Sequence, residues 1–93
     1  MADETPTLEE IQATIRAARD SVWVIDQMVE QLDAGEEANT ERKGNLDRNV
    51  EHLKIITTRD EIVNSGEDIS DLLAGITKGE AELAKHTWPA EEE

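Results

Sequence analysis

The chain has 93 residues, of which 23 are Asp or Glu and 9 are Lys or Arg, so its formal net charge is −14. A chain of this length forms at most one domain and buries only a limited core, so a helical hairpin or an oligomer is a natural architecture for it. The negative charge opposes direct binding to nucleic acid and to anionic membrane surfaces, and it favours a basic protein surface as partner. The absence of cysteine excludes disulfides and thiolate metal sites.

The N-terminus does not resemble a signal peptide. The first residues, Met-Ala-Asp-Glu-Thr-Pro, carry acids where a signal peptide needs positive charge and an apolar stretch. No apolar run is long enough to span a bilayer. We therefore expect a location in the cytoplasm, or in a particle such as a virion that is assembled there.

The first predicted helix covers residues 7–34 and follows a polar arm, residues 1–6. Its start is indicated by Pro6 and by the capping-box pattern Thr7-x-x-Glu10, and Gly35 stands where a helix-ending glycine is expected. Between these signals, apolar residues recur at alternating steps of three and four, as in the seam of a coiled coil. The seam consists of Leu8, Ile11, Ile15, Ala18, Val22, Ile25, Val29 and Leu32.

A second helix is predicted over residues 40–63, with an apolar face at Leu46, Val50, Leu53 and Ile56. The pattern Thr58-x-x-Glu61 is a further capping box, so this helix either continues to residue 63 or breaks near residue 57 and restarts. We favour the continuous helix, because a β-branched threonine disfavours a helix only slightly.

A third helix is predicted over residues 66–86, after the turn signal Asn64-Ser65-Gly66. Either Ser65 or Gly66 would cap its start, and Pro89 would end it, which leaves residues 87–93 as an acidic tail. Its apolar face contains Ile69, Leu72, Leu73, Ile76 and Leu83.

Two glycines, Gly75 and Gly79, lie four residues apart within the third helix. Each costs about 1 kcal/mol of helix stability relative to alanine, so a compensating packing contact is expected. We expect this smooth strip to receive a large side chain, either Trp23 or Trp88.

These elements predict an all-α fold, with residues 7–86 forming a single helical domain. The architecture is an antiparallel helical hairpin or a small two- to three-helix bundle with a coiled-coil-like seam. The short connection between the first two helices favours an intramolecular hairpin over self-association through the seam. The positions that flank the seam also lack a complementary charge ladder for a parallel dimer.

Four side chains are candidates for binding a protein partner. Trp23, Val24 and Met28 lie off the seam, so the centre of the first helix is apolar nearly all round. This stretch belongs either to the protein's own core, which we favour slightly, or to an interface, where Trp and Met are both enriched. Trp88 either folds back onto its own helices or anchors the tail in a neighbour.

The sequence contains no recognisable catalytic or metal-binding motif. The chain has no cysteine nucleophile and no glycine-rich phosphate loop, and its serines have no histidine nearby in sequence. His52 adjoins Glu51, and His86 follows Glu82 by one helical turn, but neither pair has a third ligand in the sequence around it. We therefore expect a protein without enzymatic activity, cofactor, metal or small-molecule substrate.

Two functional hypotheses remain, and a third, an antitoxin-like or regulatory partner of a basic protein, shares its electrostatics with the second. The first is a structural or assembly protein, a small acidic helical subunit that docks into a larger complex such as a phage particle. The second is an acidic mimic of nucleic acid that inhibits a DNA-binding protein, as anti-restriction or anti-CRISPR proteins do. The first is favoured by the apolar centre of the first helix, and the second is disfavoured by the bases interspersed over residues 36–64.

Overall fold

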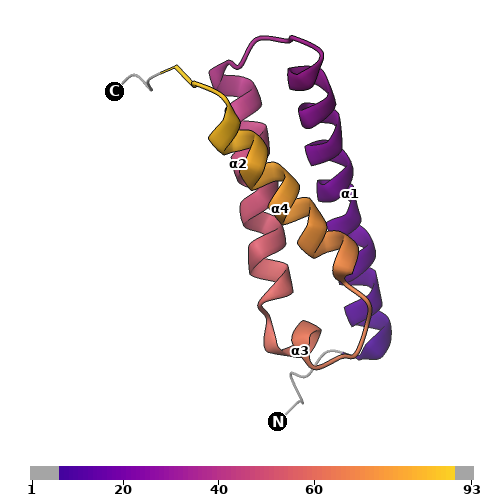
Figure 1. Cartoon of the computed structure of the whole chain (residues 1–93). Helices are drawn as coiled ribbons and strands as arrows, with labels where there is room; N and C mark the ends of the chain where they lie inside the picture. Colours follow the sequence, from indigo (N-terminus) through magenta and orange to yellow (C-terminus); the bar gives the residue numbers. More distant parts are fainter. Residues whose placement is uncertain (1–6, 90–93) are drawn as a thin grey trace.

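A computed structural model describes residues 7–89 of the chain (Figure 1). The residues of the expected N-terminal arm, 1–6, and the last four residues of the expected tail, 90–93, lie outside this described part. The helices, in chain order, are α1 (Leu8–Asp33), α2 (Thr40–Thr57), the short α3 (Asp60–Val63) and α4 (Ser70–Lys85). None of these described helices is long and apolar enough to cross a membrane.

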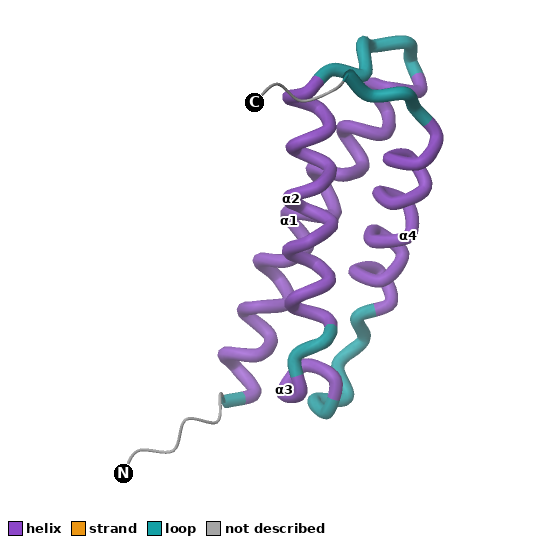
Figure 2. The backbone as a smooth tube through the Cα atoms, turned by 90° about the vertical axis from the view of Figure 1, so that its left-hand side faces the viewer, coloured by secondary structure: helices purple, strands orange, loops and turns teal. Residues whose placement is uncertain are grey.

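The three long helices form a bundle that runs up, down and up. The hairpin of α1 and the antiparallel α2 is covered on one side by α4, which runs in the same direction as α1 (Figures 1 and 2). This arrangement confirms the prediction of an all-α fold built on an antiparallel helical hairpin. The connection between α1 and α2 is short, so the two helices are neighbours in space as well as in sequence.

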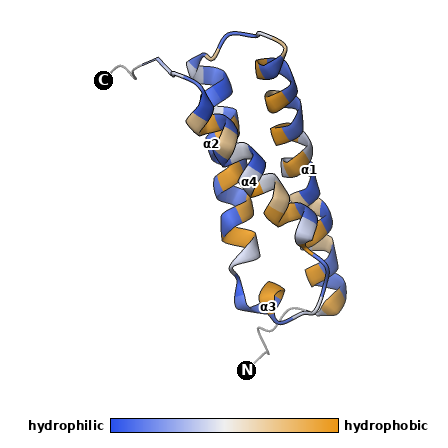
Figure 3. Cartoon of the chain, in the orientation of Figure 1, coloured by the Kyte–Doolittle hydropathy of each residue, from blue (hydrophilic) through white to orange (hydrophobic). Residues whose placement is uncertain are grey.

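The core is formed by the apolar stripes of the helices, which face the interior (Figure 3). Every seam residue of α1 is buried except Val22, which is half-buried, and Leu8, which is exposed at the start of the helix. The seam packs against the buried face of α2 and against Leu72 of α4. The α2 residues of this core are Leu46, Val50, Leu53 and Ile56.

The ends of α1 have the local structure that the sequence predicts. The Thr7 hydroxyl accepts a hydrogen bond from the Glu10 backbone N–H at 3.1 Å, and the Glu10 carboxylate accepts one from the Thr7 N–H at 2.9 Å. Gly35 has a φ of +103°, a conformation that glycine adopts without the strain of a side chain. The Glu36 N–H donates back to the carbonyl of Gln31 at 3.0 Å, which closes the helix end.

The predicted continuous helix over residues 40–63 is broken at Thr58 and Arg59. The Thr58 hydroxyl donates to the carbonyl of Lys54 at 2.8 Å instead of capping a following helix. Such side-chain bonds compete with the helical ladder, and Arg59 then adopts an extended conformation with ψ at 137°. The break turns α3 back so that Ile62, only 2% exposed, joins the core.

The predicted third helix begins later than expected, at Ser70 instead of residue 66. Residues 64–69 form a loop in which the Ser65 hydroxyl donates to the Ile62 carbonyl at 2.8 Å and accepts from the Glu67 N–H at 3.1 Å. Neither Ser65 nor Gly66 caps the helix, because Asp68 accepts the Ser70 N–H at 3.0 Å. On the apolar face of α4, Leu72 is buried but Leu73 remains 48% exposed.

The glycine strip of α4 receives aliphatic side chains rather than a tryptophan. The position that a Cβ of Gly75 would occupy lies 3.1 Å from Cγ2 of Val22. A Cβ on Gly79 would overlap Cγ2 of Val50 and would lie 3.4 Å from Cγ2 of Ile25. The two glycines therefore let α4 approach both α1 and α2 closely.

Ion pairs join α1 and α4 at intervals of seven residues on each helix. Because the two helices run in the same direction, the two residues of each pair are separated by the same number of positions in the sequence. Their side chains are about half exposed, so they contribute more to the register of the helices than to stability. The pairs are Arg19–Asp71 at 2.6 Å, Asp26–Lys78 at 2.8 Å and Asp33–Lys85 at 2.7 Å.

Candidate functional site

The four predicted partner-binding residues do not form one surface. Trp23 lies on the outer face of α1, and Trp88 lies beyond the end of α4. Met28 lies on the flank of α1 that faces α2, where its sulfur is 3.9 Å from Nδ2 of Asn45, and Val24 precedes it by one turn on that flank. The structure therefore separates these residues into three environments.

Trp23 is the most exposed large apolar side chain in the described part of the chain, at 63%. The residues one helical turn away on either side of it are polar: Arg19, Asp20, Asp26 and Gln27. Its indole is not part of the core, so the core interpretation of the α1 centre is wrong for Trp23.

Val24 and Met28 are half-buried. The side chain of Met28 packs against the core, where an unbranched thioether can fill an irregular gap between two helices. The core interpretation of the α1 centre therefore applies to Met28. Only part of its surface, and part of that of Val24, is accessible to another molecule.

Trp88 folds back onto its own helix. Its Nε1 donates a hydrogen bond to the carbonyl of Leu83 at 2.8 Å, and its ring packs against the core. The ring also meets that of His86 edge-on, with 5.5 Å between centroids and 61° between planes. Because these contacts satisfy both the polar and the apolar parts of the indole, they favour a structural role for Trp88.

A cluster of charged groups lies where α1 and α4 end. Oε2 of Glu82 is 2.6 Å from Nε2 of His86, and Oδ1 of Asp33, at the end of α1, is 2.7 Å from Nζ of Lys85. One ligand atom from each of Asp33, Glu82 and His86 lies within 4.8 Å of the others. The hydrogen bond from Lys85, and after it a hydrogen bond with Glu82, lower the pKa of Asp33 below its ordinary value of 3.8. The same bond to Asp33 raises the pKa of Lys85.

Sequence reasoning identified the Glu82–His86 pair but missed Asp33. The reason is that Asp33 reaches the pair through the packing of α1 on α4, which no local spacing reveals. A signal was present in the sequence, because Asp33 follows Asp26 by seven residues just as Lys85 follows Lys78. Matching these heptad-spaced charges between the two helices would have placed Asp33 beside Lys85.

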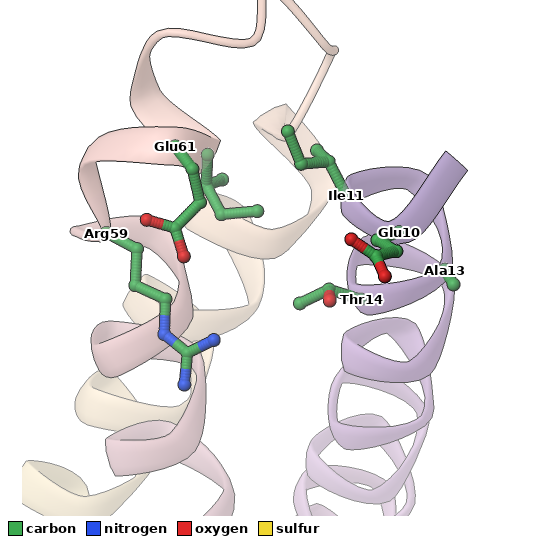
Figure 4. A pocket seen from close by; sticks show the side chains of 7 residues that line it. Glu10, Ile11, Ala13, Thr14, Arg59 and Glu61 are labelled. Atoms are coloured by element: carbon green, nitrogen blue, oxygen red, sulfur yellow. The ribbon is translucent and has the colours of Figure 1, made fainter. Parts of the chain in front are cut away.

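A cavity of about 410 Å³ lies between the first turns of α1 and α3. In Figure 4, Arg59 and Glu61 stand on one side of it, and Glu10 and Thr14 stand on the other. Its lining includes one hydroxyl, two carboxylates and one guanidinium, and no imidazole.

The chain matches no family model, no curated protein and no solved structure.

Proposed function

We propose that the protein is a non-enzymatic assembly subunit that docks onto another protein through the outer face of α1. The observation that supports this proposal is the 63% exposure of Trp23 in the middle of the longest helix. Tryptophan is enriched among the residues that dominate binding energy, and its burial in a partner removes apolar surface from water. A particle assembled in the cytoplasm, such as a virion, is one setting for such a subunit.

The charges around Trp23 indicate the chemistry of the partner. Asp20 and Glu30 lie on the same outer face, one and two helical turns from Trp23, and the whole chain carries a net charge of −14. A complementary partner has an apolar pocket for the indole and basic residues at its rim, where they steer association and fix orientation.

The test is Trp23→Ala, measured for folding stability and for affinity toward a partner captured from the native host and then purified. We expect binding to weaken at least about thirtyfold, or about 2 kcal/mol, as for a true interface anchor. The melting temperature should change little, because the side chain is mostly exposed. Leu73→Ala is the matched control, since Leu73 is an exposed apolar residue on α4 that the proposal does not use. Equal affinities for W23A, L73A and wild type would contradict the proposal.

The nucleic-acid mimic remains a second candidate because of how the bases are arranged. Six of the 9 Lys and Arg residues form ion pairs with acids of the same chain: Arg19, Arg42, Lys43, Lys54, Lys78 and Lys85. Their charge is thereby offset locally, so they interrupt the anionic surface less than the sequence suggests. A mimic would lose its partner steeply with added salt and would compete with DNA, whereas docking through Trp23 would weaken only modestly with salt and would not be displaced by DNA.

A further inference from the structure

Glu82 is a carboxylate in a position where the bundle would normally hold an apolar side chain. It is only 4% exposed and lies between α4 and the end of α1. A buried carboxylate is costly unless charged or hydrogen-bonding groups compensate it. Its environment therefore has to supply charged or hydrogen-bonding groups close to the carboxylate.

Three side chains from two elements converge at this point. The spacing of four residues places Glu82 and His86 on one side of the α4 end, with Nε2 of the imidazole 2.6 Å from a Glu82 oxygen. Asp33 comes from α1 and completes a set of one nitrogen and two carboxylate ligands within 4.8 Å of one another. This set contains an imidazole that points at a buried acid, which distinguishes it from an ordinary group of surface carboxylates.

Two independent features favour a cation here. The parallel helices α1 and α4 end at Asp33 and Lys85, whose side chains meet, so the negative ends of two helix dipoles lie at the same end of the bundle. Nζ of Lys85 already lies between the acids, 2.7 Å from Asp33 and 3.7 Å from Glu82. The Lys85 side chain is exposed, so it can turn into solvent and leave its place to another cation.

The imidazole is also held in place from behind. The ring of Trp88 meets His86 edge-on, and Trp88 is itself fixed by its hydrogen bond to Leu83. This contact limits the rotation of the imidazole, as the hydrogen bonds behind metal-binding histidines do in other metal sites.

We propose that Asp33, Glu82 and His86 bind a divalent first-row transition cation, with Zn²⁺ as the probe. Zinc takes imidazole nitrogen at about 2.0–2.1 Å and carboxylate oxygen at about 2.0–2.2 Å, so the ligands of a tetrahedral site lie about 3.3 Å apart. The three atoms already lie within 4.8 Å of one another, so side-chain rotations would have to bring them to this spacing, and water would fill the fourth position. Ca²⁺ and Mg²⁺ are disfavoured because they require more oxygen ligands and do not favour imidazole. The site does not depend on the proposed docking function.

The test is calorimetric titration of the chelator-treated full chain with Zn²⁺, and with Ca²⁺ and Mg²⁺ separately. We expect saturable one-to-one binding of Zn²⁺ alone, with a melting temperature raised by several degrees at saturation. His86→Gln should weaken binding at least about tenfold, since even outer-shell changes at metal sites cost that much. Asp26→Asn is the matched control, because Asp26 pairs with Lys78 in the same way but is not one of the three proposed ligands.

Lys85→Met provides a measurement that does not depend on removing a ligand. If Lys85 competes for the site, K85M binds Zn²⁺ more tightly than wild type, whereas general attraction to an acidic surface would also draw Ca²⁺ and Mg²⁺. The proposal is overturned by any of three results: no saturable Zn²⁺ binding, H86Q binding as well as D26N, or equal binding of all three cations. Because H86Q and K85M alter residues at the very end of α4, thermal melts without metal will show whether both variants fold.

Discussion

Gly79→Ala adds one methyl group at the closest approach between α4 and α2. The new Cβ would overlap Cγ2 of Val50 and would lie 3.4 Å from Cγ2 of Ile25. Val50 and Ile25 are buried core residues with stiff, β-branched side chains, so neither can turn away readily.

Two effects of opposite sign determine the result. Alanine in place of glycine stabilises a helix interior by about 1 kcal/mol. Overpacking a filled core by a methylene-sized group costs about 1–3 kcal/mol, and direct overlap with a rigid neighbour belongs at the upper end of that range. We therefore expect G79A to lower the free energy of unfolding by about 1–2 kcal/mol.

The two other glycines within helices serve as internal controls. At Gly44 the Cβ would meet only Nη1 of Arg48 at 3.2 Å, the flexible end of a long side chain, so Gly44→Ala should stabilise the protein by up to about 1 kcal/mol. Gly75→Ala should fall between the two, because Val22 at 3.1 Å is only half-buried and has room to shift.

Urea denaturation followed by circular dichroism measures the series. A change of 1 kcal/mol in a domain of this size moves the melting temperature by about 4–8 °C, so the ranking G44A, G75A, G79A is readily resolved. Combining G79A with Val50→Ala should recover part of the loss, since the added and removed methyl groups occupy the same space. The reasoning is refuted if G79A is as stable as wild type with an unchanged urea dependence.

Three further predictions concern the charges and the tail. Because the pKa of Asp33 is lowered in the folded protein, its pairing stabilises the fold above pH 3.8, and this stabilisation is lost as the pH falls through the pKa of the folded state. The melting temperatures of wild type and Asp33→Asn should therefore differ at neutral pH and converge in acid. Trp88→Ala should cost about 1.5–2.5 kcal/mol in thermal unfolding, roughly half the value for a fully buried tryptophan, and no loss of stability would show that the indole is not packed. Arg19→Asp should lower the melting temperature at low salt, and adding Asp71→Arg should restore it; a double variant no more stable than the single one would contradict the pairing.

The features of the fold that depend on local sequence were predictable. The helix predicted over residues 7–34 differs from α1 by one residue at each end, because Thr7 and Gly35 define its ends through bonds to their own neighbours. The alternation of three and four along the seam also determined which face of α1 is buried, since helix geometry alone relates spacing to direction.

The break between α2 and α3 could not be decided from propensity. The sequence allowed both a continuous helix and a restart, and threonine is only a weak helix breaker. The outcome depends on a hydroxyl bond from Thr58 to Lys54 and on the burial of Ile62, which a straight helix would not place in this core. Such tertiary contacts override small differences in helix preference.

The candidate sites were accessible to sequence reasoning to different degrees. Trp23 was recognised because its angular position on α1 lies off the seam, although only the packing of the other helices shows that they leave it uncovered. The association of Asp33 with Glu82 and His86 required the register between two helices that are distant in the chain. Each of those residues is ordinary in its own helix, so no local pattern distinguishes them from surface charges.

The three ion pairs between α1 and α4 have opposite polarity at their two ends, with the base on α1 at Arg19 and on α4 at Lys85. An apolar seam alone tolerates sliding by a whole heptad, because the same pattern recurs after seven residues. Here, a slip of one heptad in one direction would place Arg19 opposite Lys78, and a slip in the other would place Asp26 opposite Asp71. Each displaced alignment keeps one pair of opposite charges but sets one pair of like charges side by side, whereas the observed alignment has three pairs of opposite charges. The order of signs therefore selects one alignment during folding even though each pair contributes little to the stability of the finished bundle.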